Sequence, residues 1–387
     1  MGTALENFTD FVKFTGPAYF TGPDVFLNEA VLNSYTMSRF LRGKGLDKVI
    51  QSGEDIKDDV MFDESRTAKN YKPNAEFNWE QPQVATEQSI PWRFTVDHMS
   101  WTDQEVILNG GGSNMSRSAT KVTYKRLRKK LEQRMWTSMI NFLEAKLWAD
   151  ANSQQGEMET TSGSDQYSIP AFITEDTTAY HATDWTTIMG INPATESKWR
   201  NQVETYDYDD PDDSDGDSDG LIDAFDNMLT DVQFIPPDFH KEHFEALNLQ
   251  HSRQFIACSK GGLNQYKRLL RAANDTLVHK QDASYNRPQF DGIDLVRVSK
   301  LDTLSMIWNA TTAGTANTET AYTTDGYRYF WLNGNYMTPV FHSERYFYKM
   351  DPYFLPNQPY TRICPVDCWW NNFMHSRQRQ GIVAPQA

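Results

Sequence analysis

The sequence predicts an α+β protein, and two observations carry that prediction. Residues 115–150 place apolar side chains at intervals of three and four, which is the pattern of one long amphipathic helix. In the second half, Gln254–Cys258 is typical of a buried strand, the pair Gly261-Gly262 marks a turn, and Asn264–Ala273 shows helical spacing. A strand, a turn and a helix in succession indicate a mixed domain with a core of its own.

Composition limits the class of protein. The chain has 387 residues, 39% of them hydrophobic and 23% charged, so it is long enough to fold around more than one core. No apolar run approaches the ~20 residues of a membrane-spanning helix, and the first residues lack a basic segment followed by an apolar one. We therefore expect no membrane partner and no secretory signal. Three cysteines, Cys258, Cys364 and Cys368, are too few for a disulfide framework and fit a reducing cytoplasm.

The first 112 residues predict an arm, a helix and an extended excursion. Apolar positions from Val25 follow helical spacing. Beyond residue 50, strand-like stretches such as Ala75–Trp79 and Trp92–Val96 alternate with polar, acid-rich segments, and Gly110–Gly112 ends the region. We expect a two-stranded excursion here. Because an isolated hairpin is marginally stable in water, it needs a partner surface, which a neighbouring subunit could supply.

The first half of the long helix is strongly basic. Its cationic residues are Lys121, Lys125, Arg126, Arg128, Lys129, Lys130 and Arg134. Three interpretations stay open: a solvated helix face, a surface that contacts DNA phosphates, or a surface that contacts an acidic segment of a neighbouring subunit. Any contact with DNA would be non-specific, because phosphate contacts carry no sequence information.

Acidic residues are concentrated in the second half. Residues 204–226 hold eleven Asp and Glu and no Lys or Arg, so they account for most of the formal net charge of −15. A short helix is expected at Ala224–Val232, and further strands at Ile293–Val298 and Tyr327–Leu332.

Part of this acidic run matches a calcium-binding loop. Acids occupy positions 1, 3, 5, 9 and 12 of residues 215–226, and Gly220 occupies position 6. The position-12 acid is an Asp where the usual loop has a bidentate Glu. The predicted ligands are Asp215, Asp217, Asp219, the carbonyl of Leu221, Asp223 and Asp226. The alternative is an Asp-rich surface insertion, so Ca²⁺ is a cofactor hypothesis and no cofactor is certain.

Common catalytic sequence motifs are absent from the sequence. The chain lacks the nucleophile elbow, the P-loop and the dinucleotide-binding glycine pattern. His240 and His243 stand three apart without the zinc-protease order, and Cys258 lies in an apolar strand where a buried, inert thiol is the default. The sequence therefore does not predict an enzyme.

Several segments of the second half resemble, in their recurring order, the major capsid proteins of tailed double-stranded DNA bacteriophages. The matching segments are Gly190-Ile191-Asn192, Lys198-Trp199-Arg200-Asn201-Gln202, Phe255–Ser259 with the helix Tyr266–Leu270, Phe290–Ile293 with Leu301-Asp302, Tyr329–Asn333 with Val340–His342, and Asn371 through Arg377–Ile382. No segment is specific by itself, and their order over residues 190–383 carries the resemblance.

The resemblance implies the Hong Kong-97-type capsid fold. In that fold, the chain divides into an N-terminal arm and helix (1–50), an E-loop (51–112), a P domain (113–190) with a spine helix at 115–150, an A domain (191–330) with an acidic insertion at 204–226, and a return to the P domain with a C-terminal strand (331–387). It also implies a major capsid protein that self-assembles into an icosahedral shell around packaged DNA. Its location would be the virion, after assembly in the host cytoplasm. The implied partners are copies of the chain in hexamers and pentamers, a portal, scaffold or decoration proteins, and packaged DNA.

Charge suggests where copies meet. We expect the acidic residues Asp58, Asp59 and Asp63 to pack against Lys125, Arg126 and Lys129 of a neighbouring subunit. Two alternative functions remain at this stage: an encapsulin-like cellular nanocompartment shell, and a calcium-dependent binding or hydrolytic protein.

Overall fold

The structure of the chain is a computed structural model, which describes part of the sequence. The described residues are 36, 48–50, 53–62, 70, 85–105, 117–149, 163–175, 187–208, 220–232, 254–273, 288–303 and 327–386. They fall into two compact units. The first comprises residues 1–34, 94–143 and 342–369, and the second comprises residues 35–93, 144–341 and 370–387. The helix predicted from Val25 and the strand predicted at Ala75–Trp79 lie outside the described residues, apart from residue 36.

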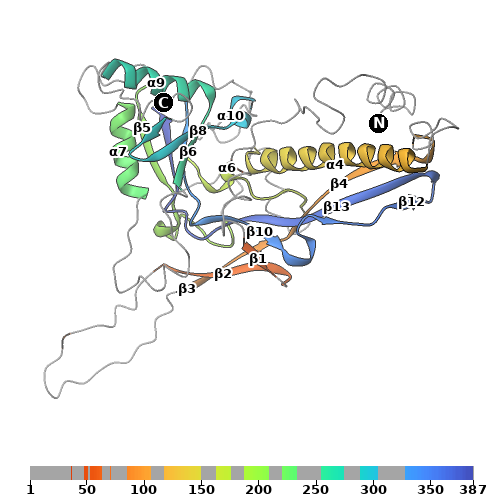
Figure 1. Ribbon diagram of the computed structural model, residues 1–387. Coiled ribbons are helices and arrows are strands. Elements are labelled where there is room, and N and C mark those ends of the chain that lie inside the picture. The colour runs from red at the N-terminus through yellow and green to blue at the C-terminus, as the bar shows by residue number, and fades with distance from the viewer. Residues whose placement is uncertain are drawn as a thin grey trace, which may run out of the picture. The chain divides into compact units, whose positions relative to one another are not determined.

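A six-stranded mixed sheet forms the centre of the second unit. In spatial order its strands are β5 (Gln202–Tyr206), β14 (Gly381–Pro385), β9 (Tyr329–Asn333), β6 (Gln254–Cys258), β8 (Ile293–Arg297) and β7 (Gln289–Phe290). Neighbouring strands β5–β14 and β6–β8 run parallel, and the other pairs run antiparallel. Helix α7 (Leu221–Val232) packs on β5 and β14, and α9 (Lys260–Ala273) packs on β6 and β8 (Figure 1).

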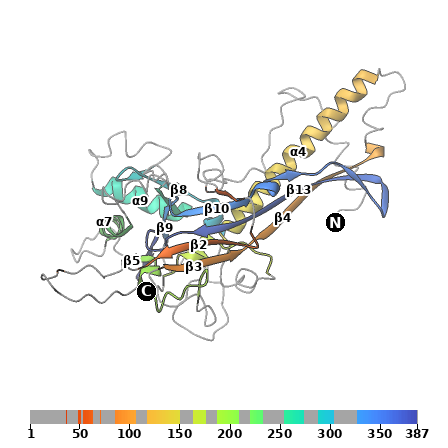
Figure 2. The ribbon, with the colours of Figure 1, turned by 90° about the horizontal axis from the view of Figure 1, so that it is seen from below.

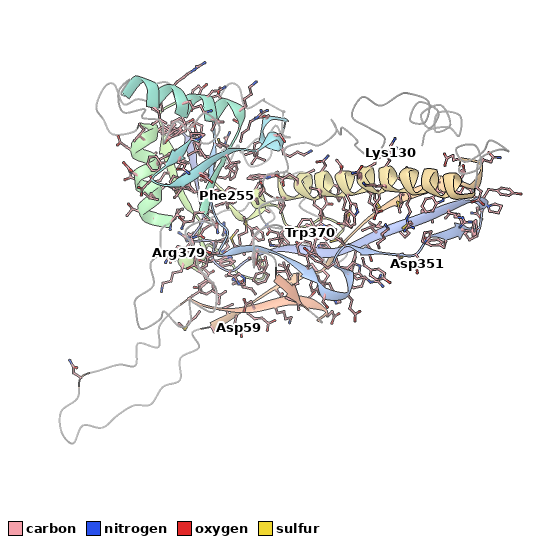
Figure 3. The ribbon with its side chains drawn as sticks, in the orientation of Figure 1. Asp59, Lys130, Phe255, Asp351, Trp370 and Arg379 are labelled. Carbon is pink, nitrogen blue, oxygen red and sulfur yellow. The ribbon has the colours of Figure 1, made fainter. Side chains whose placement is uncertain are left out.

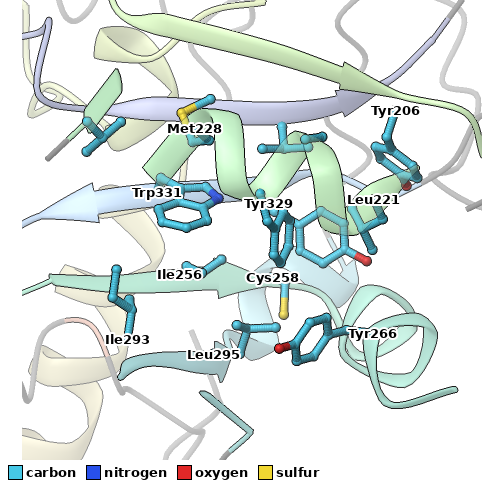
Figure 4. Packing of buried hydrophobic residues seen from close by; sticks show 14 of the residues in the cluster. Tyr206, Leu221, Met228, Ile256, Cys258, Tyr266, Ile293, Leu295, Tyr329 and Trp331 are labelled. Carbon is cyan, nitrogen blue, oxygen red and sulfur yellow. The ribbon is translucent and has the colours of Figure 1, made fainter. Parts of the chain in front are cut away.

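Aromatic side chains fill the layer between this sheet and its two helices. Phe225 of α7 stacks on Tyr266 of α9 at 5.7 Å and meets Tyr329 and Trp331 edge-on at 5.1 and 5.5 Å. Figure 4 shows Tyr329 and Trp331 lying with Ile256 and Cys258 in this layer. On the opposite face, Phe330 packs edge-on against Trp148, because successive residues of a strand point to opposite faces. Both faces of the mixed sheet are therefore covered.

The predicted glycine turn at Gly261-Gly262 is wrong, because both glycines lie in the first turn of α9. The hydroxyl of Ser259 accepts a hydrogen bond from the Gly262 amide at 3.3 Å, so the helix is N-capped just before the glycine pair. A Cβ added at Gly261 would lie 2.1 Å from the ring of Tyr327. The glycine is there because the aromatic ring packs directly on the helix backbone, and no turn is involved.

The second unit also contains a two-stranded ribbon and the end of a longer sheet. Strands β2 (Asp55–Met61) and β3 (Ala85–Pro91) pair antiparallel, side by side in Figure 2. Strand β1 (Lys48–Ile50) pairs with β10 (Met337–His342), which pairs in turn with the end of β13 (Gln358–Met374). The short helices of the unit are α6 (Ile169–Phe172), η1 (Ser197–Trp199) and α10 (Ser299–Thr303).

In the first unit, a helix packs on one face of a sheet. The sheet consists of β4 (Arg93–Thr102), β11 (Tyr348–Lys349), β12 (Tyr353–Leu355) and the first part of β13, preceded by the short helix η4 (Ser343–Arg345). Helix α4 (Arg117–Leu147) contributes residues 117–143 to this unit and lies along β4 and β13 in Figures 1 and 2. Its Met135 packs with Met99, Trp101 and Val366, and this cluster forms the core.

Most other predicted elements are present with small shifts. The helix expected at 115–150 is α4, and the strands expected at Gln254–Cys258, Ile293–Val298 and Tyr327–Leu332 are β6, β8 and β9. Helix α7 begins three residues before the predicted Ala224. The C-terminal strand is β14, which joins the mixed sheet that holds β6 and β9 and is separate from the end of β13.

Candidate assembly surfaces

A buried arginine ties together the segments that carry the family resemblance. Arg377 is fully buried and donates hydrogen bonds to the Phe172 carbonyl (2.7 Å), the Trp199 carbonyl (2.7 Å) and Oδ1 of Asn201 (2.8 Å). The Asn201 amide also donates to the Thr174 carbonyl at 2.7 Å. Because a buried guanidinium must satisfy its donors, this arrangement fixes three chain segments against one another.

A second set of hydrogen bonds continues from this point. The backbone N–H of Gln202 donates to the backbone carbonyl of Gln380 at 2.9 Å. The Gln380 side chain donates to the Asn333 carbonyl at 2.9 Å and accepts from the Asn333 N–H at 2.7 Å. Residues from three of the resembling segments thus meet inside one unit. We call Asn201, Asn333, Arg377 and Gln380 the polar node. Its role is structural, because it is closed to solvent.

The ribbon β2–β3 has an inner and an outer face, and the predicted acidic group is divided between them. Asp58 faces inward, where its Oδ2 lies 2.9 Å from Nδ1 of His375 of the same chain. Asp59 points to the opposite side, as alternate residues of a strand must, and is exposed (Figure 3). Asp63 lies outside the described residues. Asp58 and Asp59 therefore do not form one acidic surface.

The inner face of the ribbon already has a partner within its own chain. Ile56 and Ile90 are opposite one another and both are buried. The outer face carries Asp59 and the Lys57–Glu87 ion pair of 2.6 Å, and Met61 is 70% exposed at the end of β2. Glu54, just before β2, is also exposed. The partner surface that the hairpin was expected to need is thus supplied on its inner face by its own chain, and the outer face is exposed.

The basic side of α4 faces away from its sheet. Lys129 and Arg134 are exposed, whereas Met135 and Met139 are buried on the side that packs on the sheet. Arg128 is exposed as well, but it stands seven residues before Met135 and so lies on the same side of the helix as Met135. Figure 3 shows Lys130 on the side of α4 away from β4 and β13. The helix backbone also contains Lys125 and Arg126, whose side chains lie outside the described part of the structure.

The sheet of the first unit exposes an aromatic face opposite α4. Phe94 and Val96 of β4 are 62% and 68% exposed, while their neighbours Thr95 and Met99 are buried. Phe94 meets Trp369 edge-on at 4.8 Å. Sequence reasoning missed this face, although its signal was the alternation of large apolar residues with polar ones along residues 93–102.

Arg345 adds a positive charge to the same face. The guanidinium of Arg345 lies 5.2 Å from the ring centroid of Tyr348 and 5.6 Å from that of Trp369, within the range of cation–π attraction. Arg345 also lies 3.7 Å from Asp367. The two interpretations of the high aromatic content, a large core and extensive interfaces, both apply: the mixed sheet holds the core, and this face has the composition of an interface.

The predicted calcium ligands are only partly described. Asp215, Asp217 and Asp219 lie outside the described residues. Leu221 is buried at the start of α7, and Asp223 and Asp226 lie three residues apart in that helix, Asp226 being exposed. No group of three or more His, Cys, Asp or Glu side chains arranged for a metal occurs among the described residues.

The cysteines have the properties of buried, unreactive thiols. Burial raises the pKa of Cys258 to about 12, and burial raises the pKa of Cys368 to about 12 as well. Both thiols are protonated at neutral pH and are poor nucleophiles. His240 and His243 lie outside the described residues. Among the helices that the structure describes, none is long and apolar enough to cross a membrane.

Comparison with solved structures gives the fold. No family model and no curated protein matches the chain. A chain of the "Cyanophage A-1(L) capsid asymmetric unit" matches with a TM-score of 0.50 and 11% identity, over 96% of each chain. The chain has the fold of a phage capsid protein. A chain of the "Asymmetric unit of bacteriophage PhiM1 mature capsid" is also similar, with a TM-score of 0.49 and 11% identity over 96% of this chain and 92% of that one.

At these identities the capsid fold is shared although few side chains are. The roles of individual residues therefore follow from this chain's own contacts and exposed faces, such as the polar node.

Proposed function

We propose that this chain is a major capsid protein whose copies assemble into an icosahedral shell around packaged phage DNA. The likeness in fold to the cyanophage capsid chain, over 96% of both chains, is the observation that carries the proposal. The exposed aromatic face of the first unit supports it, because a large apolar face rimmed by charge marks an interface between proteins. The shell would form in the host cytoplasm and become part of the virion.

In this proposal the elements take the roles of the Hong Kong-97-type fold. The ribbon β2–β3 belongs to the E-loop, α4 is the spine helix of the P domain, and the mixed sheet with α7 and α9 is the A domain. Copies form hexamers and pentamers. A portal, scaffold or decoration proteins and the packaged DNA are further partners, and the DNA is held through non-specific contacts.

Contact between copies would use the outer face of the ribbon and the basic side of α4. Asp59 of one copy, with Glu54 just before β2, faces Lys129 and Arg134 of another, together with Lys125 and Arg126 in the same helix. Each exposed pair contributes only about 0–1 kcal/mol, so repetition over the shell supplies the strength. Asp58 is outside this contact, because its partner is His375 of its own chain.

The test is expression of the full chain and electron microscopy of the purified product. Closed shells built of hexamers and pentamers support the proposal, and a protein that stays monomeric at assembly concentrations contradicts it. The contents of the shells separate the related functions, because a nanocompartment encloses cargo protein and a phage head does not.

We also propose that Ca²⁺ binds at residues 215–226. Eleven acidic residues within 204–226 repel one another, and a divalent cation with oxygen ligands relieves that repulsion. Removal of Ca²⁺ by EDTA is expected to lower the melting temperature by about 2–4 °C, which corresponds to about 1 kcal/mol. A variant with Asp215→Asn and Asp217→Asn should no longer respond. An unchanged melting curve, with no calcium bound at millimolar concentration by calorimetry, would leave only a solvated acidic insertion.

A further inference from the structure

The two helices on the mixed sheet expose opposite charges. The outward side of α7 carries Asp223, Asp226 and Asp231, and no Lys or Arg occurs within the helix. Asp226 and Asp231 are exposed and Asp223 is half-buried. The inward side is apolar throughout and packs on the sheet, with Phe225 and Met228 buried. We call the outward side of α7 the acidic stripe.

Helix α9 is the reverse. Lys260 and Arg268 are exposed and Lys267 is half-buried on its outward side, and the helix contains no Asp or Glu. The spacing of seven and eight residues from Lys260 places all three on one side of the helix. Its inward residues Tyr266 and Leu269 belong to the same buried cluster as Phe225 of α7. We call the outward side of α9 the basic stripe.

Within the part of the chain that the structure describes, neither stripe is neutralised by an ion pair. Among the described residues, no ion pair joins Asp226, Asp231 or Arg268 to an opposite charge. The acidic side instead adds a further carboxylate, because Glu204 of β5 lies beside Asp231. Burial, and then the nearby charge of Asp231, raise the pKa of Glu204. The described residues of one unit therefore present two exposed helix faces of opposite sign, one over β5 and β14 and the other over β6 and β8.

We propose that α7 of one copy docks against α9 of the next copy, so that the acidic stripe meets the basic stripe head to tail. This rests on the proposed function, because a shell brings copies of the chain together in closed rings. Two different patches on one molecule make a heterologous contact, and a heterologous contact repeated by rotation closes into a ring. Complementary charge also fixes which faces meet and rejects the like-charged alternatives.

A second copy fits both stripes, and other occupants fit only one. DNA phosphates would bind the basic stripe but be repelled by the acidic stripe on the same unit. A divalent cation held by residues 215–226 would neutralise Asp223 and Asp226 at most, and would leave Asp231 and the basic stripe for another partner. A second copy of this chain satisfies both stripes in a single contact.

The experiment exchanges the charges of the two stripes, with EDTA present throughout so that a bound cation plays no part. One variant carries Asp226→Lys and Asp231→Lys, a second carries Lys267→Glu and Arg268→Glu, and a third carries all four substitutions. The yield of shells is measured by sedimentation and electron microscopy. Each two-site variant is expected to lose at least ten-fold in yield, because like charges then meet at every contact.

The four-site variant gives the decisive result. Its reversed stripes match one another, so it is expected to assemble alone with a yield close to that of the unaltered chain. It should not co-assemble with the unaltered chain, because a mixed contact sets like charges together. Co-assembly is measured by affinity purification of a tagged copy and quantification of the untagged copy that is bound to it. Free mixing of the two chains, or two-site variants with a normal yield, would overturn the proposal.

Controls separate this contact from folding and from the proposed function. Asp351→Lys changes the charge of an exposed residue in the other unit by the same amount as Asp231→Lys and should leave the yield unchanged. Circular dichroism checks that each variant folds. If a two-site variant does not fold, the neutral changes Asp231→Asn and Arg268→Gln replace it, and each should raise the protein concentration needed for assembly. If the unaltered chain forms no shells, the proposed function is contradicted. If shells form but their yield does not depend on the charges of the two stripes, only this contact is contradicted.

Discussion

The mixed sheet and the sheet of the first unit differ in how their faces are covered. The mixed sheet is covered on one face by α7 and α9, and Trp148 packs against Phe330 on its other face. The sheet of the first unit is covered by α4 on one face and leaves Phe94 and Val96 exposed on the other. A sheet covered on both faces is stable within a single chain. A sheet with one bare apolar face reaches its full burial only against another molecule.

Removal of the Arg377 side chain should have the largest effect, and it would act on the unit of the mixed sheet. Arg377→Met removes the guanidinium that donates to the Phe172 and Trp199 carbonyl oxygens in a buried site, whereas Oδ1 of Asn201 keeps its hydrogen bonds from Thr174. The expected loss is about 3 kcal/mol or more of the free energy of unfolding, since each unsatisfied buried group costs about 1–3 kcal/mol. Chemical denaturation measures the loss. The exposed control Arg268→Met should change stability by no more than about 0.5 kcal/mol.

The first unit offers a matched pair of substitutions on opposite faces of one strand. Met99→Ala removes a buried side chain from the cluster with Met135 and should cost about 3 kcal/mol. Phe94→Ala, five residues earlier and facing outward, should change the stability of the monomer by no more than about 1 kcal/mol but reduce shell formation. Denaturation of the monomer and electron microscopy of the assembled product give the two readouts. If Phe94→Ala leaves assembly intact, the bare face is not a contact between copies.

The sequence predicted elements whose signal is local. Helix α4 and strand β6 follow from residue spacing within one segment, and both are found within three residues of the predicted bounds. Strand β13 is the longest strand described, yet its apolar residues are interrupted by Pro365 and Asp367, and its pairing with four other strands is non-local. No periodicity within β13 identifies those partners.

The candidate surfaces were less predictable than the fold. The inward turn of Asp58 depends on the register of β2 with β3 and on the position of His375, which lies more than 300 residues away in the chain. Arg377 belongs to one of the segments that carry the family resemblance, but the sequence does not predict its burial, because arginine is usually exposed. The charge pattern identified the basic residues of α4 and the acidic run that leads into α7, while the direction of each side chain came only from packing.

A smaller effect is expected at the glycine pair of α9, and it tests how tightly the mixed sheet is packed. Gly261→Ala gains about 1 kcal/mol of helix propensity but forces the Tyr327 ring away, which typically costs 1–3 kcal/mol. We expect a net loss of about 1 kcal/mol. Gly262→Ala meets the Tyr329 ring at 3.2 Å and should be close to neutral. Thermal melts rank the two variants by melting temperature. A higher melting temperature for Gly261→Ala would show that the Tyr327 ring moves aside at little cost.

The smallest effect concerns the acidic edge of the mixed sheet. The pKa of Glu204 is raised by burial and by Asp231, so its charged form weakens the folded state. The sign follows from linkage: the penalty is present above the folded-state pKa and disappears as pH falls below the ordinary Glu value of about 4.3. Glu204→Gln should therefore stabilise the monomer at pH 7 by a few tenths of a kcal/mol, about 0.2–0.5 after screening by solvent, and leave it unchanged near pH 3.5. The contrasting variant Glu87→Gln breaks the exposed ion pair with Lys57 and should act in the opposite direction. Denaturation at both pH values measures the difference, and equal gains at pH 7 and pH 3.5 would show that charge at Glu204 is not the cause.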